Sequence, residues 1–317
     1  MSKILITGGA GFIGAHTAKA LLDAGEEVVL YDNLDDFLYP TEFKQKRLEH
    51  VFAGQDRPKL VIGDILDGKL LNEVFADEEF DKVIHLAALA NPGKSMDAAE
   101  PYTLVNVMGS LNVLELAREY EVPHVIVAGS SSVYNDEQTP FIETMYPLRP
   151  RSPYGASKAA METYCRLWHE LHGIHITVLR FFSVYGPWGR PDMAPMIFAD
   201  RILDDQQLEL SQNRERDFTY IDDIVRGILA AVEKRFEYEV INLGRGEPQK
   251  LEQFVQAIEA AAGRKANIVM REAPPGEMQA TYANIEKAKD LLGYHPTVSI
   301  EEGAAKLVDW VKTYRTL

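Results

Sequence analysis

The feature that most constrains this chain is a glycine-rich segment, residues 7–14, which joins a β-branched run to a helical pattern. Its glycines are Gly8, Gly11 and Gly14, in the spacing G-x-x-G-x-x-G. A tight turn there needs residues without a Cβ, and bare backbone N–H groups at a helix start bind phosphate. The segment therefore predicts a dinucleotide-binding strand–turn–helix unit.

An acidic residue, Asp32, ends the next predicted strand, 18 residues after Gly14. In a dinucleotide-binding fold a carboxylate there hydrogen-bonds a ribose hydroxyl and repels a 2′-phosphate, so it favours NAD over NADP. The strand, spacing, helix and acid together favour a cofactor site over a purely structural turn. Asp64 follows the third strand, where it would either flank the adenine or cap a helix.

Short apolar runs alternate with helical patterns along the first 180 residues. The expected strands lie at residues 3–6, 27–31, 59–62, 82–86, 124–128 and 174–179, and the clearest helices at 12–24, 102–119 and 153–171. Such alternation is typical of a parallel sheet with helices on both faces. We therefore expect an α/β protein with a Rossmann-type, doubly wound parallel sheet.

The pattern changes after Phe182, where Pro187, Gly189 and Pro191 mark an irregular loop. We expect a boundary near residue 180, with an NAD-binding Rossmann domain over residues 1–180 and a smaller α/β substrate-binding domain over 181–317. An apolar run at residues 240–243 predicts one more strand that rejoins the first sheet, so the division need not be clean.

The composition excludes several classes of function. Lys and Arg total 33 against 48 Asp and Glu, and the resulting charge of −15 disfavours nucleic acid and anionic lipid as partners. The sequence has no run of about 18 consecutive apolar residues, so we expect no segment that spans a membrane. The lone cysteine, Cys165, excludes an internal disulfide and is typical of a cytoplasmic protein. His169, His172 and His175 share no helix face, so we expect no metal site.

A phenol and an ammonium, Tyr154 and Lys158, stand four residues apart on one face of a predicted helix. A neighbouring ammonium and an oxidised nicotinamide would both lower the pKa of the phenol. The phenolate could then take a proton from a sugar hydroxyl. A serine run at residues 130–132 ends the preceding strand, where parallel sheets bind ligands. The alternative is an ordinary pair on a helix surface.

Together these motifs resemble the extended short-chain dehydrogenase/reductases of the nucleotide-sugar epimerase type, over essentially the whole chain. The resemblance is carried by residues 7–14, 85–88, 130–134, 154–158, 179–193 and 216–223. It implies a catalytic set of Ser130, with Ser131 as an alternative, Tyr154 and Lys158. It also implies a homodimer formed through two helices, at residues 102–119 and 153–171 here.

The same resemblance implies NAD as the cofactor. The residues implied to bind it are Gly8, Gly11, Phe12, Ile13, Gly14, Asp32, Asn33, Asp64, Ile65, Leu86, Ala87, Ala88, Tyr154 and Lys158.

The residues directly after the catalytic serine indicate the reaction. Related dehydratases and decarboxylases carry an acid there, whereas this chain has Ser131 and Ser132, so simple epimerisation fits better. Residues 180–193 closely resemble UDP-glucuronate 4-epimerases, and Ser183 stands where neutral-sugar epimerases usually carry Asn. The implied reaction converts UDP-glucuronate to UDP-galacturonate through a 4-keto intermediate, without decarboxylation.

The resemblance also assigns the substrate contacts. Ser131, Ser132 and Ser183 would hold the sugar carboxylate with Arg190 as a charged partner, Arg216 would bind the diphosphate and Glu277 the uridine ribose. Because the 4-keto intermediate is a β-keto acid, hydroxyl donors that fix its carboxylate would prevent loss of CO₂. In a chain of charge −15, these few groups predict a cationic pocket inside an anionic surface.

Two departures from the family pattern leave alternatives open. Asn135 replaces the usual glycine after residues 133–134, and an arginine common in the uronate subgroup is missing near Gly93. A 4-epimerase of a neutral UDP-sugar, such as UDP-glucose or a UDP-N-acetylhexosamine, is the second interpretation. A third is a catalytically silent NAD-binding regulator, against which the intact Ser130, Tyr154 and Lys158 argue.

Overall fold

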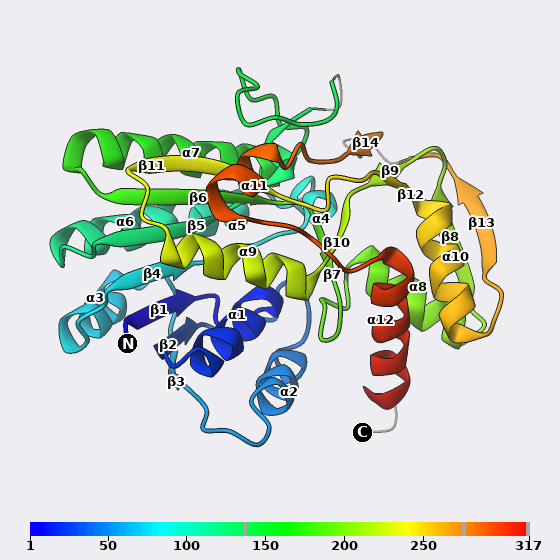
Figure 1. The fold of residues 1–317 in the computed structure, drawn as a ribbon, viewed down its shortest axis with the longest axis horizontal. Coiled ribbons are helices and arrows are strands. Elements are labelled where there is room, and N and C mark those ends of the chain that lie inside the picture. The colour runs from blue at the N-terminus through cyan, green and yellow to red at the C-terminus, as the bar shows by residue number, and fades with distance from the viewer. Residues whose placement is uncertain (136–137, 274–276, 315–317) are drawn as a thin grey trace.

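The centre of the protein is a seven-stranded parallel sheet with helices on both faces (Figure 1). The computed structural model describes residues 1–135, 138–273 and 277–314. Across the sheet the strands are β11 (Tyr238–Leu243), β6 (His175–Phe181), β5 (His124–Ser130), β4 (Lys82–His85), β1 (Lys3–Thr7), β2 (Glu27–Asp32) and β3 (Lys59–Ile62). The chain reverses its winding between β1 and β4, which is where open α/β sheets bind ligands. The expected doubly wound α/β fold is confirmed.

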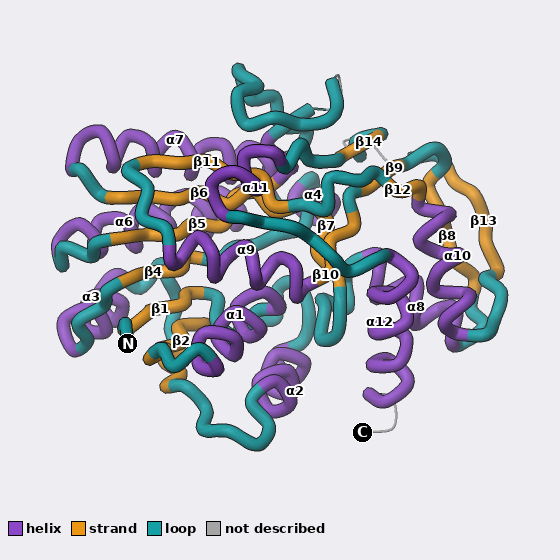
Figure 2. Tube along the Cα trace, in the orientation of Figure 1, coloured by secondary structure: helices purple, strands orange, loops and turns teal. Residues whose placement is uncertain are grey.

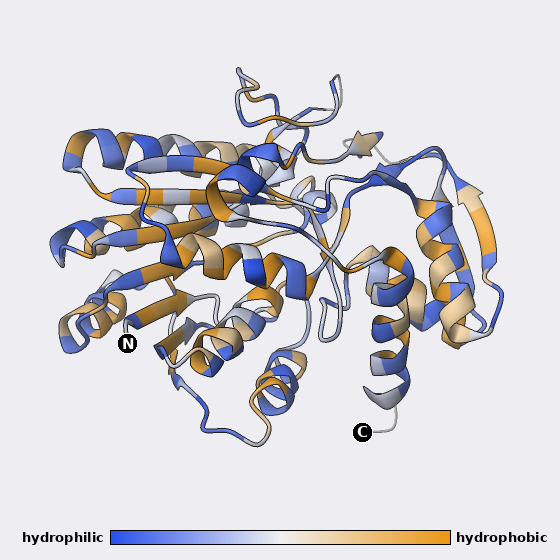
Figure 3. Cartoon of the chain, viewed as in Figure 1, coloured by the Kyte–Doolittle hydropathy of each residue, from blue (hydrophilic) through white to orange (hydrophobic). Residues whose placement is uncertain are grey.

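Two layers of helices cover the sheet, because successive strand residues point to opposite faces. On β1, Ile4 and Ile6 pack in one hydrophobic cluster and Leu5 in another. The first cluster is covered by α1 (Phe12–Asp23), α2 (Thr41–Val51), α9 (Ile221–Glu233) and α11 (Glu286–Leu292), and the second by α3 (Gly68–Asp77), α6 (Ser110–Glu119) and α7 (Pro153–His172). Figure 3 shows hydrophobic residues concentrated along the central strands.

The helix expected at residues 102–119 is built differently from a regular α-helix. It begins earlier, as α5 (Ala99–Thr103), continues through a π-helical segment (Leu104–Gly109) and ends as α6. The buried Asn106 lies in the π-helical segment. Its Nδ2 donates to the Leu89 carbonyl and to Ser157 Oγ, both at 2.9 Å, and its Oδ1 accepts from Leu89 N at 2.8 Å. The segment thus joins the loop after β4, which contains α4 (Pro92–Ser95), to α7.

The C-terminal half adds short sheets and three packed helices beside the main sheet (Figure 2). The pairs are β7 (Ser183–Tyr185) with β10 (Phe218–Tyr220), β8 (Gln207–Ser211) with β13 (Asn267–Arg271), and β9 (Glu215–Arg216) with β12 (Gln249–Lys250) and β14 (Ala280–Thr281). The helices are α8 (Ala194–Leu203), α10 (Leu251–Ala262) and α12 (Ile300–Tyr314). The strand expected near residues 240–243 is β11, which extends the main sheet beside β6. The domain division at residue 180 stays a prediction.

Among the described residues, the helices are all too short or too polar to span a membrane.

Candidate active site

A cavity of about 550 Å³ lies at the carboxyl ends of the central strands, between the two halves of the chain. Its walls come from the glycine-rich loop, the ends of β2, β4 and β5, the start of α7 and the segments after β6. The sequence-predicted site residues all line it: Gly8, Gly11, Phe12, Ile13, Gly14, Asp32, Asn33, Asp64, Ile65, Leu86, Ala87, Ala88, Ser130, Ser131, Ser132, Tyr154, Lys158, Ser183, Arg190, Arg216 and Glu277.

The glycine-rich loop has the geometry of a phosphate cradle. Gly8 adopts φ +71°, and a Cβ on it would lie 2.6 Å from the Ala87 nitrogen. A Cβ on Gly14 would lie 2.3 Å from the Gly8 carbonyl oxygen. Neither position tolerates a side chain, so the loop exposes backbone at the start of α1, where N–H groups and the helix dipole favour a diphosphate. The residues present therefore fit a dinucleotide.

Asp32 does more than the sequence indicated. Its buried carboxylate accepts hydrogen bonds from Ala10 N at 3.0 Å and from Leu34 N at 2.9 Å. Lys44 Nζ lies 3.9 Å from the same group. Asp32 thus holds the glycine-rich loop in place, while its contact with a cofactor ribose stays a prediction.

Asp64 ties together the loops that follow β2 and β3. Its Oδ1 accepts from Leu66 N at 2.8 Å, and its Oδ2 accepts from Asn33 Nδ2 at 2.9 Å. The helix that follows is capped by Asp67, whose side chain accepts from two backbone N–H groups of α3. The interpretation of Asp64 as a helix cap is therefore wrong, because a different acid fills that role.

Ser130, Tyr154 and Lys158 meet at the inner end of the cavity. Ser130 is the last residue of β5, and α7 begins at Pro153, capped by Ser152 Oγ, which accepts from Gly155 N at 3.1 Å. Lys158 Nζ donates to the Ala128 carbonyl at 2.9 Å, and the Ser130 side chain is a hydrogen-bonding partner that lowers the pKa of Tyr154. Tyr154 is 8% exposed and Lys158 3%, so the alternative of a surface helical pair is wrong.

Burial opposes both charges in this set. Burial raises the pKa of Tyr154, whereas the hydrogen bond with Ser130 and the positive charge of Arg190 lower it. Burial lowers the pKa of Lys158 to about 8, opposed by the negative charge of Glu162. In this structure the cation that lowers the pKa of the phenol is Arg190, and the predicted effect of Lys158 on it stays untested.

The buried ion pair behind Lys158 was not predicted from the sequence. Arg180 Nη2 lies 2.6 Å from Glu162 Oε2, and Arg180 Nη1 donates to the Tyr134 hydroxyl at 2.6 Å. Glu162 stands four residues after Lys158 on α7. Glu162, whose charge is balanced by Arg180, thus places a carboxylate close to the buried ammonium of Lys158. The one sequence signal for this ion pair was the position of Glu162, one helical turn after Lys158.

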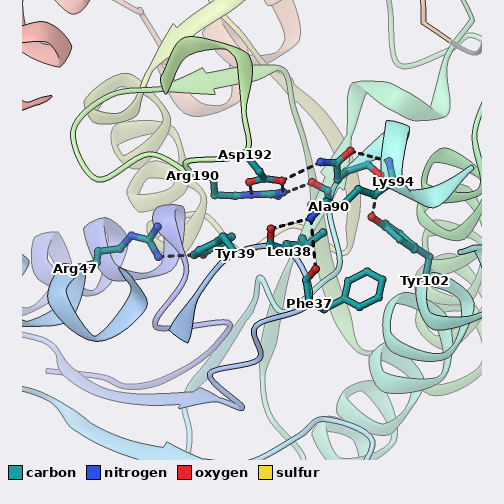
Figure 4. A network of polar contacts seen from close by, with 10 residues as sticks. Phe37, Leu38, Tyr39, Arg47, Ala90, Lys94, Tyr102, Arg190 and Asp192 are labelled. Carbon is teal, nitrogen blue, oxygen red and sulfur yellow. Dashed lines mark hydrogen bonds and ion pairs between the residues drawn. The ribbon is translucent and has the colours of Figure 1, made fainter. Parts of the chain in front are cut away.

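Arg190 is held by a set of polar contacts that the sequence did not predict (Figure 4). Its Nε and Nη2 lie 3.0 Å and 2.7 Å from the two carboxylate oxygens of Asp192, and its Nη1 donates to the Ala90 carbonyl. Asp192 also accepts from Asn91 Nδ2 at 2.9 Å. Arg190 therefore lines the cavity with its charge balanced and its guanidinium fixed to the loop after β4.

The remaining predicted substrate residues fall into two groups. Ser131 and Ser132 form a short 3₁₀ turn after β5, and Ser183 begins β7. Arg216 Nη2 lies 3.0 Å from Glu277 Oε1, so the two residues assigned separately to the diphosphate and the ribose are themselves paired. Residues 274–276, the start of the Pro-Pro-Gly-Glu motif, lie outside the described residues.

The cavity lining is close to electrically balanced. Among the described residues it has five cations and four carboxylates, namely Lys44, Arg151, Lys158, Arg190 and Arg216 against Asp32, Asp35, Asp64 and Glu277. This slight cationic excess stands against a chain charge of −15. Anionic ligands are therefore to be held by local donors rather than by the field of the whole molecule.

A buried phenol and ammonium one helical turn apart, facing a dinucleotide cradle, are the hallmark of the short-chain dehydrogenase/reductases. The second half of this chain adds a walled pocket beside them, which places it with the extended members of that class. The chain belongs to the NAD dependent epimerase/dehydratase family, whose sequence profile matches residues 4–244. The expected resemblance and the dependence on NAD are thereby confirmed.

Several relatives resemble the chain over nearly its full length. The UDP-glucuronate 4-epimerase of Thermodesulfobacterium geofontis is 38% identical over 315 residues, covering 98% of this chain and 97% of that protein. The crystal structure of the UDP-glucuronic acid 4-epimerase of Bacillus cereus with UDP-glucuronic acid and NAD has a TM-score of 0.92, 34% identity and coverage of 98% and 99%. The UDP-glucose 4-epimerase of Thermotoga maritima with UDP-glucose has a TM-score of 0.88, 29% identity and 99% coverage of each chain.

Proposed function

We propose that the chain is an NAD-dependent UDP-glucuronate 4-epimerase, which forms UDP-galacturonate through a 4-keto intermediate without decarboxylation. The observation that carries this proposal is the row of serine hydroxyls, Ser131, Ser132 and Ser183, lining the cavity that also holds Tyr154. The residues directly after Ser130 are Ser131 and Ser132, so no acid stands beside it to act as a base for elimination. The similarity to the uronate 4-epimerases of T. geofontis and B. cereus supports the same assignment.

The cradle formed by the glycine-rich loop and Asp32 would hold the cofactor, with Lys158 at its inner end. NAD bound there would supply reversible hydride transfer at C4 of the sugar, with no net oxidation. External nicotinamide is therefore not consumed.

The chain's own contribution to the chemistry is proton transfer by Tyr154. As a phenolate it takes the C4 hydroxyl proton when the sugar is oxidised and gives it back when the ketone is reduced. The hydrogen bond with Ser130 stabilises the phenolate, since it lowers the pKa of the phenol. Lys158, fixed to the Ala128 carbonyl, adds positive charge at the same buried end of the cavity.

Retention of the carboxylate is assigned to the serine hydroxyls. Each hydroxyl donor to an ionised carboxylate contributes on the order of 1.5–3 kcal/mol. A carboxylate held in this way keeps its C–C bond out of alignment with the C4 carbonyl, so CO₂ is not lost. Arg190 is already paired with Asp192, so it would contribute an ion pair of fixed orientation beside the sugar carboxylate rather than an uncompensated positive charge.

The test is direct: purified protein is incubated with UDP-glucuronate, and the C4 configuration of the product is read by NMR. UDP-galacturonate is expected, with no UDP-pentose and no requirement for added nicotinamide. Turnover of UDP-glucose without turnover of UDP-glucuronate would establish the neutral-sugar alternative instead. A Tyr154→Phe variant as active as the wild type would revive the interpretation as a silent regulator.

We further propose that the chain forms a homodimer through the π-helical segment and α7. Exposed apolar side chains gather on these neighbouring elements, among them Leu104, Met108, Leu167 and Leu171. Large apolar side chains exposed on two neighbouring elements support an interface there. Met108→Glu with Leu171→Glu is expected to halve the mass measured by light scattering, whereas a monomeric wild type would contradict the proposal. A cytoplasmic location stays a prediction, supported by the buried, unpaired Cys165.

A further inference from the structure

Arg47, on α2, is a fully buried cation that the proposed mechanism does not use. Among the described residues, its guanidinium has no carboxylate within ion-pair distance, and its Nη2 is buried without a hydrogen-bond partner. A buried charge without a counter-ion is costly, so its retention implies a specific role.

The hydrogen bonds of Arg47 reach three separate parts of the cavity wall. Nη1 donates to the Ala10 carbonyl at 2.7 Å and to the Tyr39 hydroxyl at 3.1 Å, and Nε donates to the Trp188 carbonyl at 2.9 Å. Ala10 belongs to the glycine-rich loop, Tyr39 to the loop after β2, and Trp188 to the segment after β7. Figure 4 shows Arg47 pointing at Tyr39, and the guanidinium carbon of Arg190 lies 5.8 Å from the centroid of the same ring.

Trp188 is held in an uncommon conformation by the same helix. Its φ of 59° is in the left-handed region, which costs a non-glycine residue free energy unless its surroundings fix it. Phe43 and His50 of α2 pack against the indole, with ring centroids 5.6 Å and 4.8 Å away, while Arg47 binds the carbonyl. Two residues later the chain presents Arg190 to the cavity.

We propose that Arg47 is a positioning residue that couples the cofactor loop to the substrate loop. A guanidinium is planar and its donors keep fixed directions, so an acceptor that moves on one side shifts the best position for the acceptors on the other. A diphosphate bound at the glycine-rich loop would both fix Ala10 and partly compensate the buried charge behind it. With Ala10 fixed, the Arg47 guanidinium would be held in one position, and its hydrogen bond to Trp188 would in turn fix the segment that positions Arg190.

The experiment measures whether the two ligands bind cooperatively. Cofactor-free protein carrying Tyr154→Phe, which prevents turnover, is titrated with UDP-glucuronate by calorimetry, with and without saturating NAD, because the sugar carboxylate is the group assigned to Arg190. With the wild-type Arg47, NAD is expected to raise the affinity for UDP-glucuronate roughly fivefold or more, within the usual range of coupling between sites. Arg47→Lys keeps the charge but loses the planar set of guanidinium donors. It is expected to reduce the ratio of the affinities measured with and without NAD to about one.

Lys46→Gln is the matched control, because it removes a cation from the exposed face of the same helix and should keep the wild-type ratio. A folded Arg47→Lys protein with an unchanged ratio would overturn the proposal. So would a protein with the wild-type Arg47 in which NAD leaves the affinity for UDP-glucuronate unchanged. Binding and turnover are measured separately, so a protein that binds UDP-glucuronate without epimerising it would count against the proposed function and leave the coupling intact.

Discussion

At the scale of single residues, Ser130 is expected to set the pH at which the enzyme works. Its hydrogen bond lowers the pKa of Tyr154, while burial raises it. Ser130→Ala removes the lowering effect, so the pKa of the phenol rises and less phenolate is present at a given pH. The acidic limb of the kcat/KM profile should therefore move to higher pH. Ser130→Thr keeps the hydroxyl and serves as the control; an unmoved limb in the alanine variant would contradict the prediction.

The Arg190–Asp192 pair gives a second prediction at this scale. Asp192→Asn removes the bidentate partner of a guanidinium that lines the cavity, leaving its charge uncompensated and its orientation free. Because charge-assisted pairs of this kind are strong, we expect kcat/KM for UDP-glucuronate to fall roughly tenfold. We also expect some UDP-pentose, formed by loss of CO₂ from a less firmly held intermediate. Product analysis by NMR measures both. Asp205→Asn, an exposed change of the same chemistry, should have no effect.

The sequence was enough to group candidate site residues that lie within one local motif, but it did not predict the contacts between distant motifs. Tyr154 and Lys158 are one helical turn apart, and Gly8 to Gly14 form one loop, so spacing alone brings each group together. Arg47 and Trp188 are 141 residues apart, and Asn91 and Asp192 101 apart. Such pairs meet only because the sheet brings distant loops to one edge, and a single sequence contains no signal for them.

At the scale of elements, the start of α7 places Tyr154, the proposed catalytic tyrosine. Ser152 caps this helix at Gly155 N, and Tyr154 lies in its first turn. Ser152→Ala is expected to lower the free energy of unfolding by about 1 kcal/mol and to reduce kcat, since fraying of this turn displaces the phenol. Urea unfolding and initial rates measure the two effects. Thr163→Ala removes a hydroxyl from the exposed face of the same helix and should leave both unchanged.

Helices and strands could be predicted where their buried positions are apolar and regularly spaced, and they were missed where a buried position is polar. The inner strands of the main sheet are buried on both faces and therefore have apolar sequences, whereas the edge strand β3 is largely exposed. Helix α2 gives no clear pattern, because a buried position of its inner face is Arg47 rather than an apolar residue. The π-helical segment was expected to be α-helical, since the bonds of Asn106 to Leu89 and Ser157 that accompany it are not local.

At the scale of the whole molecule, the site is built at the expense of stability, and Lys158 shows this most directly. Burial lowers its pKa from 10.5 to about 8. Between pH 8 and pH 10.5 the unfolded chain therefore binds more protons at Lys158 than the folded chain does. The loss of stability caused by the buried ammonium is fully present below pH 8 and fades as the pH rises from 8 to 10.5. Its size is on the order of 3 kcal/mol before the bond to Ala128 is considered.

Lys158→Met should therefore abolish epimerisation and yet raise the free energy of unfolding at pH 7, by on the order of 1–2 kcal/mol after loss of that hydrogen bond. The gain should shrink towards zero, and then reverse, as the pH approaches 10.5. Urea unfolding at pH 7 and at higher pH measures it, with the exposed Lys46→Met as the control for loss of charge in a chain of charge −15. If the variant is less stable than the wild type at pH 7, then Glu162 and the Ala128 carbonyl compensate the buried ammonium fully, and the site carries no stability penalty at this residue.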